Sequence, residues 1–177
     1  MSVRDMFASV AIASANDAVT ALGEALSGTY DLFITLMNER AAEFGMKNTV
    51  FINSTGLPAD GHVTTAHDMA ILASRLINDF PEVTVFTSLY EDYVRENTDD
   101  PFWLVNTNKL IRYVDGVDGL KTGYTDSAGS CLAATAKRGD MRIVAVVMGA
   151  ETAQDRNREV ARLIEFAFSQ YELHPRL

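Results

Sequence analysis

The hydrophobic pattern of this 177-residue chain changes from helical to strand-like near residue 90. Before that point apolar residues recur every three or four positions, as at Val19, Leu22 and Leu26, which indicates amphipathic helices. Beyond it, shorter alternating runs indicate strands, and a helix closes the chain. These later elements are predicted at 103–105, 131–136, 141–149 and 152–171. The pattern therefore predicts an α+β (α/β) fold, with an α-helical lobe at 1–90 and an α/β lobe at 91–177.

Start and stop signals divide the first lobe into helices. Ser2 and Asp5 have the spacing of a capping box, in which each side chain bonds the backbone N–H of the other residue. Thr65 and Asp68 repeat this spacing before a later helix. The helices are predicted to end near Ser14, Gly28, Phe44 and just before Pro81. The segment 53–61 is rich in turn-forming residues and is predicted to be a loop.

Composition excludes several classes of protein. A formal net charge of −9 with scattered arginines argues against binding to nucleic acid or to an anionic membrane surface. Acidic residues gather at 91–100, which is predicted to form a solvated surface. The longest apolar stretches, such as 143–150, are too short to span a bilayer, and the first residues lack the features of a signal peptide. The single cysteine, Cys131, is predicted to pack in a buried strand.

Lys121, Thr122 and Gly123 form the most informative short motif. They place a cation and a hydroxyl at the lip of a predicted strand, which suits the binding of a small carboxylate. Far upstream, Ser14 and Asn16 lie at the end of the first helix. Taken alone, these two would be a cap or turn pair, and Lys121 an exposed lysine at a strand edge. Together, a Ser-x-Asn and a later Lys-Thr-Gly are two of the three signatures of penicillin-recognising serine enzymes.

The third signature, a Ser-x-x-Lys that carries the nucleophilic serine, does not occur in the sequence. The chain has four lysines. The residues three positions before them are Phe44, Asn106, Asp118 and Ala134. None of these is a serine, so the sequence carries two walls of an acyl-transfer site without the residue that would be acylated.

With these motifs the chain resembles the serine-type D-alanyl-D-alanine carboxypeptidases, the low-molecular-mass penicillin-binding proteins of peptidase family S11. The segments that carry the resemblance are 13–18, 37–40, 45–49, 56–61, 117–123 and 141–142. The resemblance implies a transpeptidase-like fold in which an α-helical lobe is inserted into an α/β lobe with a five-stranded antiparallel sheet. It also implies that the first strands and the nucleophile-bearing helix belong upstream of Met1. The domain would then be incomplete, and we expect this chain alone to be inactive.

The resemblance implies an activity and a substrate-binding set. Members of the family remove the terminal D-Ala of peptidoglycan stem peptides through an acyl-enzyme. By this resemblance Lys121 and Thr122 would hold the terminal D-Ala carboxylate, and Gly123 would keep the strand edge open to the substrate backbone. Arg156, near the start of the last helix, matches a family arginine close to the carboxylate pocket.

The resemblance also implies catalytic roles. Ser14 would relay a proton towards the leaving D-Ala, and Asn16 would orient the substrate amide and the missing lysine. The backbone N–H of Tyr124 would be one donor of the oxyanion hole. Lys121 belongs to this catalytic set as well as to the carboxylate clamp.

Ligands and location follow from the resemblance in the same way. The intact protein would bind β-lactam antibiotics, need no cofactor, and lie outside the cytoplasm in the cell envelope, associated with the membrane. No metal is implied, because His62, His67 and His174 lack metal-binding spacing. The missing elements would leave an open strand edge and uncovered apolar side chains, so we expect this chain to self-associate.

Two alternatives stay open. The first is a non-catalytic domain of the same fold that binds peptidoglycan or a partner through the same groove. The second, less favoured, is a β-lactamase, which would usually have Ser-Asp-Asn where this chain has Ser14-Ala15-Asn16. No glutamate in the sequence begins the Glu-x-x-Leu-Asn segment that such an enzyme uses for deacylation.

Overall fold

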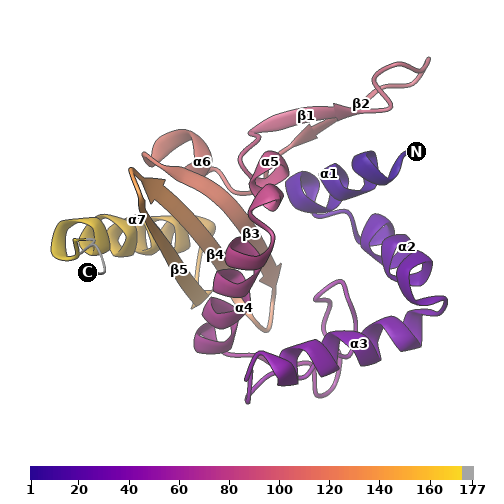
Figure 1. The fold of residues 1–177 in the computed structure, drawn as a ribbon, viewed down its shortest axis with the longest axis horizontal. Coiled ribbons are helices and arrows are strands. Elements are labelled where there is room, and N and C mark those ends of the chain that lie inside the picture. Colours follow the sequence, from indigo (N-terminus) through magenta and orange to yellow (C-terminus); the bar gives the residue numbers. More distant parts are fainter. Residues whose placement is uncertain (173–177) are drawn as a thin grey trace.

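The computed structural model describes residues 1–172 and has the α+β fold that the sequence pattern predicts (Figure 1). The helices are α1 (Val3–Ala13), α2 (Asn16–Ser27), α3 (Tyr30–Glu43), α4 (Ala66–Asp79), α5 (Thr84–Thr87), α6 (Leu110–Tyr113) and α7 (Ala153–Gln170), with a 3-10 turn at Pro81–Val83. The strands are β1 (Glu91–Val94), β2 (Phe102–Val105), β3 (Val117–Thr125), β4 (Gly129–Arg138) and β5 (Met141–Ala150). The four predicted helices before Pro81 and the closing helix are confirmed; α5, α6 and β1 were not predicted.

Capping side chains begin α1 and α4, but only the first of the two predicted capping boxes is complete. At α1 the capping box is complete, because Ser2 Oγ accepts from the Asp5 N–H and Asp5 Oδ2 accepts from the Ser2 N–H, each at 3.1 Å. At α4, Thr65 Oγ1 accepts from the Asp68 N–H at 3.2 Å. The Asp68 carboxylate does not complete that box; it accepts instead from the Asn48 N–H at 2.7 Å.

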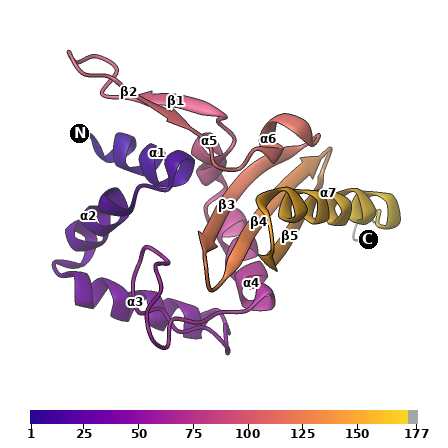
Figure 2. The ribbon, with the colours of Figure 1, turned by 180° about the vertical axis from the view of Figure 1, so that it is seen from behind.

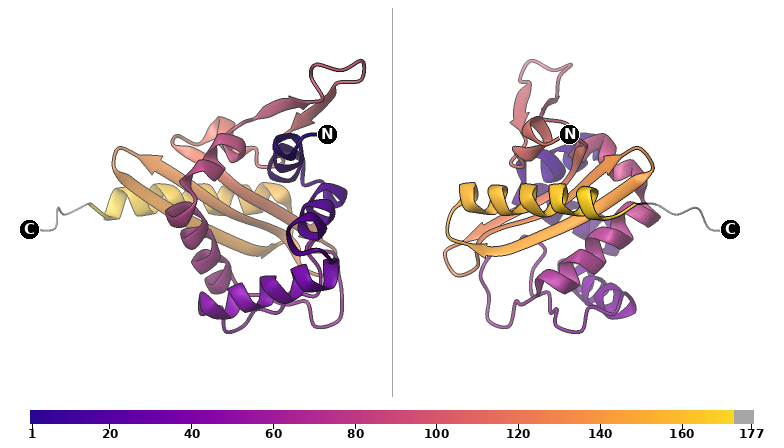
Figure 3. Two further views of the ribbon diagram at one scale, coloured as in Figure 1. Left: turned by 45° about the vertical axis from the view of Figure 1, so that its right-hand side comes forward. Right: turned by 90° about the vertical axis from the view of Figure 1, so that its left-hand side faces the viewer.

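The main sheet lies between two helices. Its strands are antiparallel in the order β3-β4-β5. Leu132 and Ala134 of β4 pack with Val160 and Ile164 of α7. A second cluster joins the sheet to α4 and contains Ala73, Ile77, Leu120, Ala133 and Val144. Figure 3 shows α7 across one face and α4 across the other, so α4 packs on the sheet although the sequence division counts it with the helical lobe.

A β-hairpin of β1 and β2 stands apart from the main sheet. Most of the residues at 91–100, which were predicted to form a solvated surface, are exposed; the buried exception is Val94, at the end of the strand that pairs with β2. Val94 is buried against Ile12 of α1, in a cluster that also contains Leu104. This contact is distant in sequence, and therefore a local count of charges does not reveal it.

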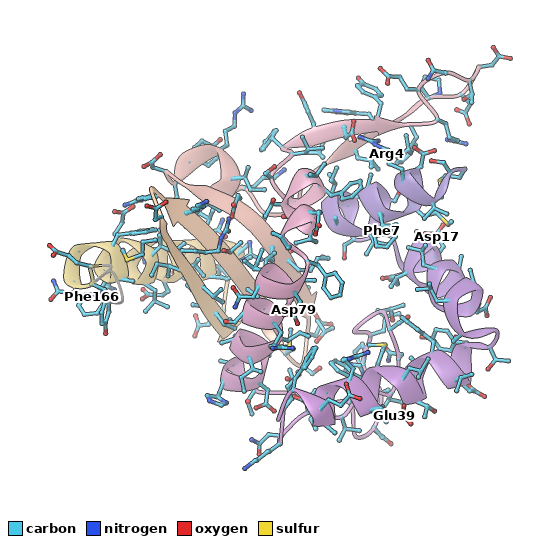
Figure 4. All side chains as sticks on the ribbon, viewed as in Figure 1. Arg4, Phe7, Asp17, Glu39, Asp79 and Phe166 are labelled. Carbon is cyan, nitrogen blue, oxygen red and sulfur yellow. The ribbon has the colours of Figure 1, made fainter. Side chains whose placement is uncertain are left out.

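The first helices form an arc that begins at the hairpin. Figures 1 and 2 show α1, α2 and α3 following one another from the hairpin towards the segment before α4. Figure 4 labels Arg4 and Phe7 on α1. The Arg4 guanidinium lies 3.6 Å from the Asp92 carboxylate in the hairpin, and the Phe7 ring stacks on Phe86 at 6.2 Å between centroids. The first half of α1 is thereby held against the hairpin and α5.

Candidate functional site

A cleft of about 1200 Å³ collects the predicted site residues. Its walls come from the α1–α2 turn, from the loop at 51–64 and from strands β3, β4 and β5. The predicted residues that line it are Ser14, Asn16, Lys121, Thr122, Gly123 and Tyr124. Two short motifs that lie about a hundred residues apart in the chain therefore face one space.

Ser14 occupies a strained turn. It is the C-terminal cap of α1 with φ of 61° and ψ of 40°, a left-handed conformation that non-glycine residues seldom adopt. Its N–H donates to Val10 O at 3.2 Å, and α2 begins two residues later at Asn16. The turn exposes Ser14 and Asn16 to the cleft instead of continuing the helix. Strain of this kind persists where surrounding structure holds it, and it is common at functional sites.

Lys121 is a partly buried cation in the cleft wall. Its Nζ donates to the carbonyl oxygen of Thr122 at 2.9 Å. Burial lowers the pKa of Lys121 to about 8, because removing an ammonium from water disfavours its charged form. A partly buried ammonium is a suitable partner for a carboxylate, so the predicted role of Lys121 in anion binding is compatible with its position and stays a prediction.

Thr122 and Gly123 differ in how the protein holds them. The Thr122 hydroxyl donates to Thr107 Oγ1 at 2.7 Å. A Cβ added at Gly123 would lie 3.9 Å from the Cβ of Cys131, which is an ordinary contact. Packing within the described residues therefore does not explain glycine at position 123, and the approach of a ligand backbone would.

Tyr124 and Cys131 line the same cleft. The Tyr124 side chain is exposed, and its hydroxyl donates to Asp126 Oδ1 at 3.0 Å, a bond that raises the pKa of Tyr124. Cys131 is only partly buried, which corrects the prediction of a buried packing residue. Its backbone pairs with Gly123 across the β3–β4 ladder, which places the thiol beside the Lys-Thr-Gly strand.

The loop at 51–64 forms one wall of the cleft, and its place in the site was not predicted from the sequence. Asn53 organises it, because its Oδ1 accepts from the Gly56 N–H at 2.8 Å and its Nδ2 donates to Leu57 O at 2.9 Å. Asn38 of α3 attaches the loop to the helical segment through both backbone groups of Phe51, at 2.7 and 2.8 Å. Turn-forming residues predicted a loop here, but no local signal indicated that it faces β3.

Asp68 fixes the base of that loop. Its carboxylate accepts from the Asn48 N–H at 2.7 Å and from the Thr49 hydroxyl at 2.8 Å. Burial by itself would raise the pKa of Asp68, but these hydrogen bonds outweigh it and hold the pKa below its usual value. The ionised carboxylate therefore links α4 to the chain that leads into the loop.

Arg156 lies outside the set of cleft-lining residues. It is buried in the first turn of α7, where its guanidinium donates to Asn157 Oδ1 at 2.8 Å and to Cys131 O at 3.5 Å. Burial lowers its pKa. The side chain therefore supports the strand that carries Cys131, and direct contact with a carboxylate stays a prediction.

Residues 1–172 contain neither a cluster of metal ligands nor a membrane-spanning helix. No group of three or more His, Cys, Asp or Glu side chains in this range is placed to hold a metal ion, and no helix in it is long and apolar enough to cross a membrane. The Nδ1 of His62 accepts from the Ile52 N–H at 3.1 Å, and His67 lies beside Asp68. His174 lies outside the described residues.

Comparison with known proteins agrees with this arrangement. The model of the D-alanyl-D-alanine carboxypeptidase family matches residues 1–152. Penicillin-binding protein D2 of Listeria monocytogenes, solved with cefotaxime bound, superposes with a TM-score of 0.86 at 40% identity over 95% of this chain and 67% of that chain. The carboxypeptidase DacD of Francisella tularensis gives a TM-score of 0.89 at 33% identity, over 97% of this chain and 53% of that chain. The fold is thus that of the penicillin-binding proteins.

Sequence relatives narrow this class to one family. The D-alanyl-D-alanine carboxypeptidase DacF of Bacillus subtilis is 54% identical over 175 residues, which are 99% of this chain and 45% of DacF. DacC of Escherichia coli is 39% identical over 173 residues, or 97% of this chain and 42% of DacC. The chain belongs to the D-alanyl-D-alanine carboxypeptidase family, and it spans less than half the length of these two relatives.

Proposed function

We propose that this chain provides the substrate-recognition part of a serine-type D-Ala-D-Ala carboxypeptidase of cell-wall metabolism. The observation that carries the proposal is the meeting of Ser14 and Asn16 with Lys121 and Thr122 in one cleft. The substrate would be a peptidoglycan stem peptide that ends in D-Ala-D-Ala. Its terminal carboxylate is an anion, and Lys121 is the partly buried cation in this wall.

The reaction would proceed through an acyl-enzyme. A serine oxygen attacks the carbonyl carbon between the two D-alanines, and the C–N bond breaks. Ser14 would pass a proton to the nitrogen of the departing D-Ala, while Asn16 orients the amide. Water then attacks the ester, releasing the shortened peptide and restoring the serine. During both attacks the Tyr124 N–H would stabilise the oxyanion; losing one such donor typically costs about 100- to 1000-fold in rate.

The attacking serine is the part that this sequence does not supply. The chain has no Ser-x-x-Lys, and Ser14 has no lysine three residues later, because Asp17 stands there. We therefore propose that this chain alone neither hydrolyses the substrate nor becomes acylated. The domain would act when a preceding segment of the family type completes the cleft, and it would then also bind β-lactams. Such a protein would work outside the cytoplasm, where peptidoglycan lies.

The test is to join this chain to the segment that precedes the matched region in Bacillus subtilis DacF. The fusion should release D-Ala from a peptide ending in D-Ala-D-Ala and should leave the L-Ala-L-Ala peptide intact, while the chain alone should release neither. A folded fusion without D-Ala release would contradict the proposal.

A second candidate follows from the missing Ser-x-x-Lys. In this reading the chain is a non-catalytic domain that holds the stem peptide through the same cleft. Calorimetric binding of a D-Ala-D-Ala peptide to the chain alone, together with an inactive fusion, would favour this candidate over the enzyme.

A further inference from the structure

The short connection between β2 and α6 contacts the end of α1 and strand β3. It contains Asn106, Thr107 and Asn108. The two asparagine side chains are 1% and 0% exposed, whereas Thr107 between them is exposed. Fully buried amides are costly unless every polar atom is bonded, so two of them on either side of one exposed threonine call for an explanation.

Each buried amide is hydrogen-bonded through both its nitrogen and its oxygen. Asn106 Nδ2 donates to Thr87 O at 3.2 Å and to Leu89 O at 2.8 Å, and its Oδ1 accepts from the Asn108 N–H at 2.8 Å. Asn108 Nδ2 donates to Gly119 O at 2.9 Å, two residues before the lysine of the Lys-Thr-Gly strand. The connection is therefore fastened to the segment before the hairpin and to β3 at the same time.

Thr107 joins the two motif-bearing elements. Its N–H donates to Ile12 O in the last turn of α1 at 3.1 Å, two residues before Ser14. Its Oγ1 accepts from the Thr122 hydroxyl at 2.7 Å. A hydroxyl that accepts one hydrogen bond retains its own hydrogen for another acceptor. Thr107 is not itself among the residues that line the cleft, but it is exposed beside Thr122, so its hydrogen is free for an acceptor that lies against Thr122.

We infer that Thr107 is a second hydroxyl of the carboxylate clamp and that Asn106 and Asn108 are positioning residues for it. This inference rests on the proposed function, because it concerns the same pocket. A substrate carboxylate beside Lys121 would accept from the Thr107 hydroxyl, which Thr122 polarises through their mutual hydrogen bond. The buried amides keep the connection in place, so the hydroxyl pair is formed before the anion arrives. Preorganised donors of this type bind better than donors that must first be ordered.

The test compares two substrates in the fusion with the DacF segment. One peptide ends in a free D-Ala-D-Ala carboxylate, and the other carries that carboxylate as a methyl ester. The quantity measured is the ratio of kcat/KM for the acid to kcat/KM for the ester. We expect Thr107→Val to lower this ratio about tenfold and Thr107→Ser to restore most of it, since charge-assisted hydrogen bonds to carboxylates have roughly that value. Asn108→Ala should lower the ratio in the same direction.

Thr35→Val is the matched control, because Thr35 is an exposed threonine on α3 whose hydroxyl donates to Asp31 O of its own helix at 3.0 Å. It should leave the ratio unchanged. If Thr107→Val lowers kcat/KM equally for the acid and the ester, or changes neither value, Thr107 has only a structural role. The inference is then wrong, while the proposed function stands. If the parent fusion releases no D-Ala, the proposed function and the inference both fail.

Discussion

At the scale of single residues, Lys121 is the lysine of the cleft wall, and its pKa is lowered by burial. Its folded pKa of about 8 lies below the usual 10.5, so the folded state binds the proton less tightly than the unfolded state does. Between these two values the unfolded chain holds more protons, and stability should rise with pH. Binding of the proposed substrate carboxylate should instead weaken as the pH rises, because the carboxylate pairs with the ammonium form of Lys121.

The pKa of Lys121 can be measured directly. After reductive methylation with a 13C label, the NMR signal of Lys121 should titrate with a midpoint near 8, below the usual 10.5 of a lysine. A Lys121→Met variant assigns the signal. A midpoint near 10.5 would mean that the ammonium is fully hydrated and that the cleft wall is more open than described.

The carboxylate clamp predicts an order of effects in the fusion with the DacF segment. Lys121→Ala removes a charge-assisted bond and should lower kcat/KM on the D-Ala-D-Ala peptide about 10- to 100-fold. Thr122→Val should act in the same direction but less, since it removes a neutral hydroxyl whose hydrogen is donated to Thr107. Lys137→Ala is the matched control, because this lysine is exposed at the far end of β4. Wild-type kcat/KM for Lys121→Ala would show that the pocket is wrongly assigned.

At the scale of elements, α7 and the sheet form the main core, and one pair of neighbours on α7 tests this. Ile164 is fully buried, while Leu163 beside it is 45% exposed. Ile164→Ala should lower the free energy of unfolding by about 2–5 kcal/mol, as truncation of buried aliphatic residues does. Leu163→Ala should cost much less. Urea unfolding of each variant measures both, and equal losses would contradict this packing.

The elements also show what the sequence allows one to predict. Capping by Ser2 and Thr65 and the apolar stripe of α7 are local signals, and they place those helices closely. The Lys-Thr-Gly and Ser-x-Asn motifs identify two walls of the cleft. Strand β1 was not predicted, because its buried residue Val94 packs against α1, which is distant in sequence. The loop at 51–64 was not predicted to be a wall of the cleft, because a residue of another element, Asn38, holds it in place. Long-range contacts of this kind have no local signature.

At the scale of the whole molecule, the described residues leave the sheet with open edges. Within residues 1–172, β5 pairs with β4 and with no further strand, and the cleft beside it is lined in part by Val146 and Met148. Open edges and apolar surfaces favour association. We therefore expect the chain expressed alone to form dimers or larger species in light scattering after size-exclusion chromatography. A monomer at micromolar concentration with sharp cooperative unfolding would contradict this.

We propose above all that this chain holds the recognition walls of a penicillin-binding site but not its nucleophile. Fluorescent penicillin followed by intact mass spectrometry tests the claim most directly, because acylation leaves a covalent mass on the protein. We predict a stoichiometric adduct on the fusion with the DacF segment, outside residues 1–177 of this chain, and no adduct on the chain alone. A stable penicillin adduct on Ser14, or on any other serine of this chain, would contradict the account.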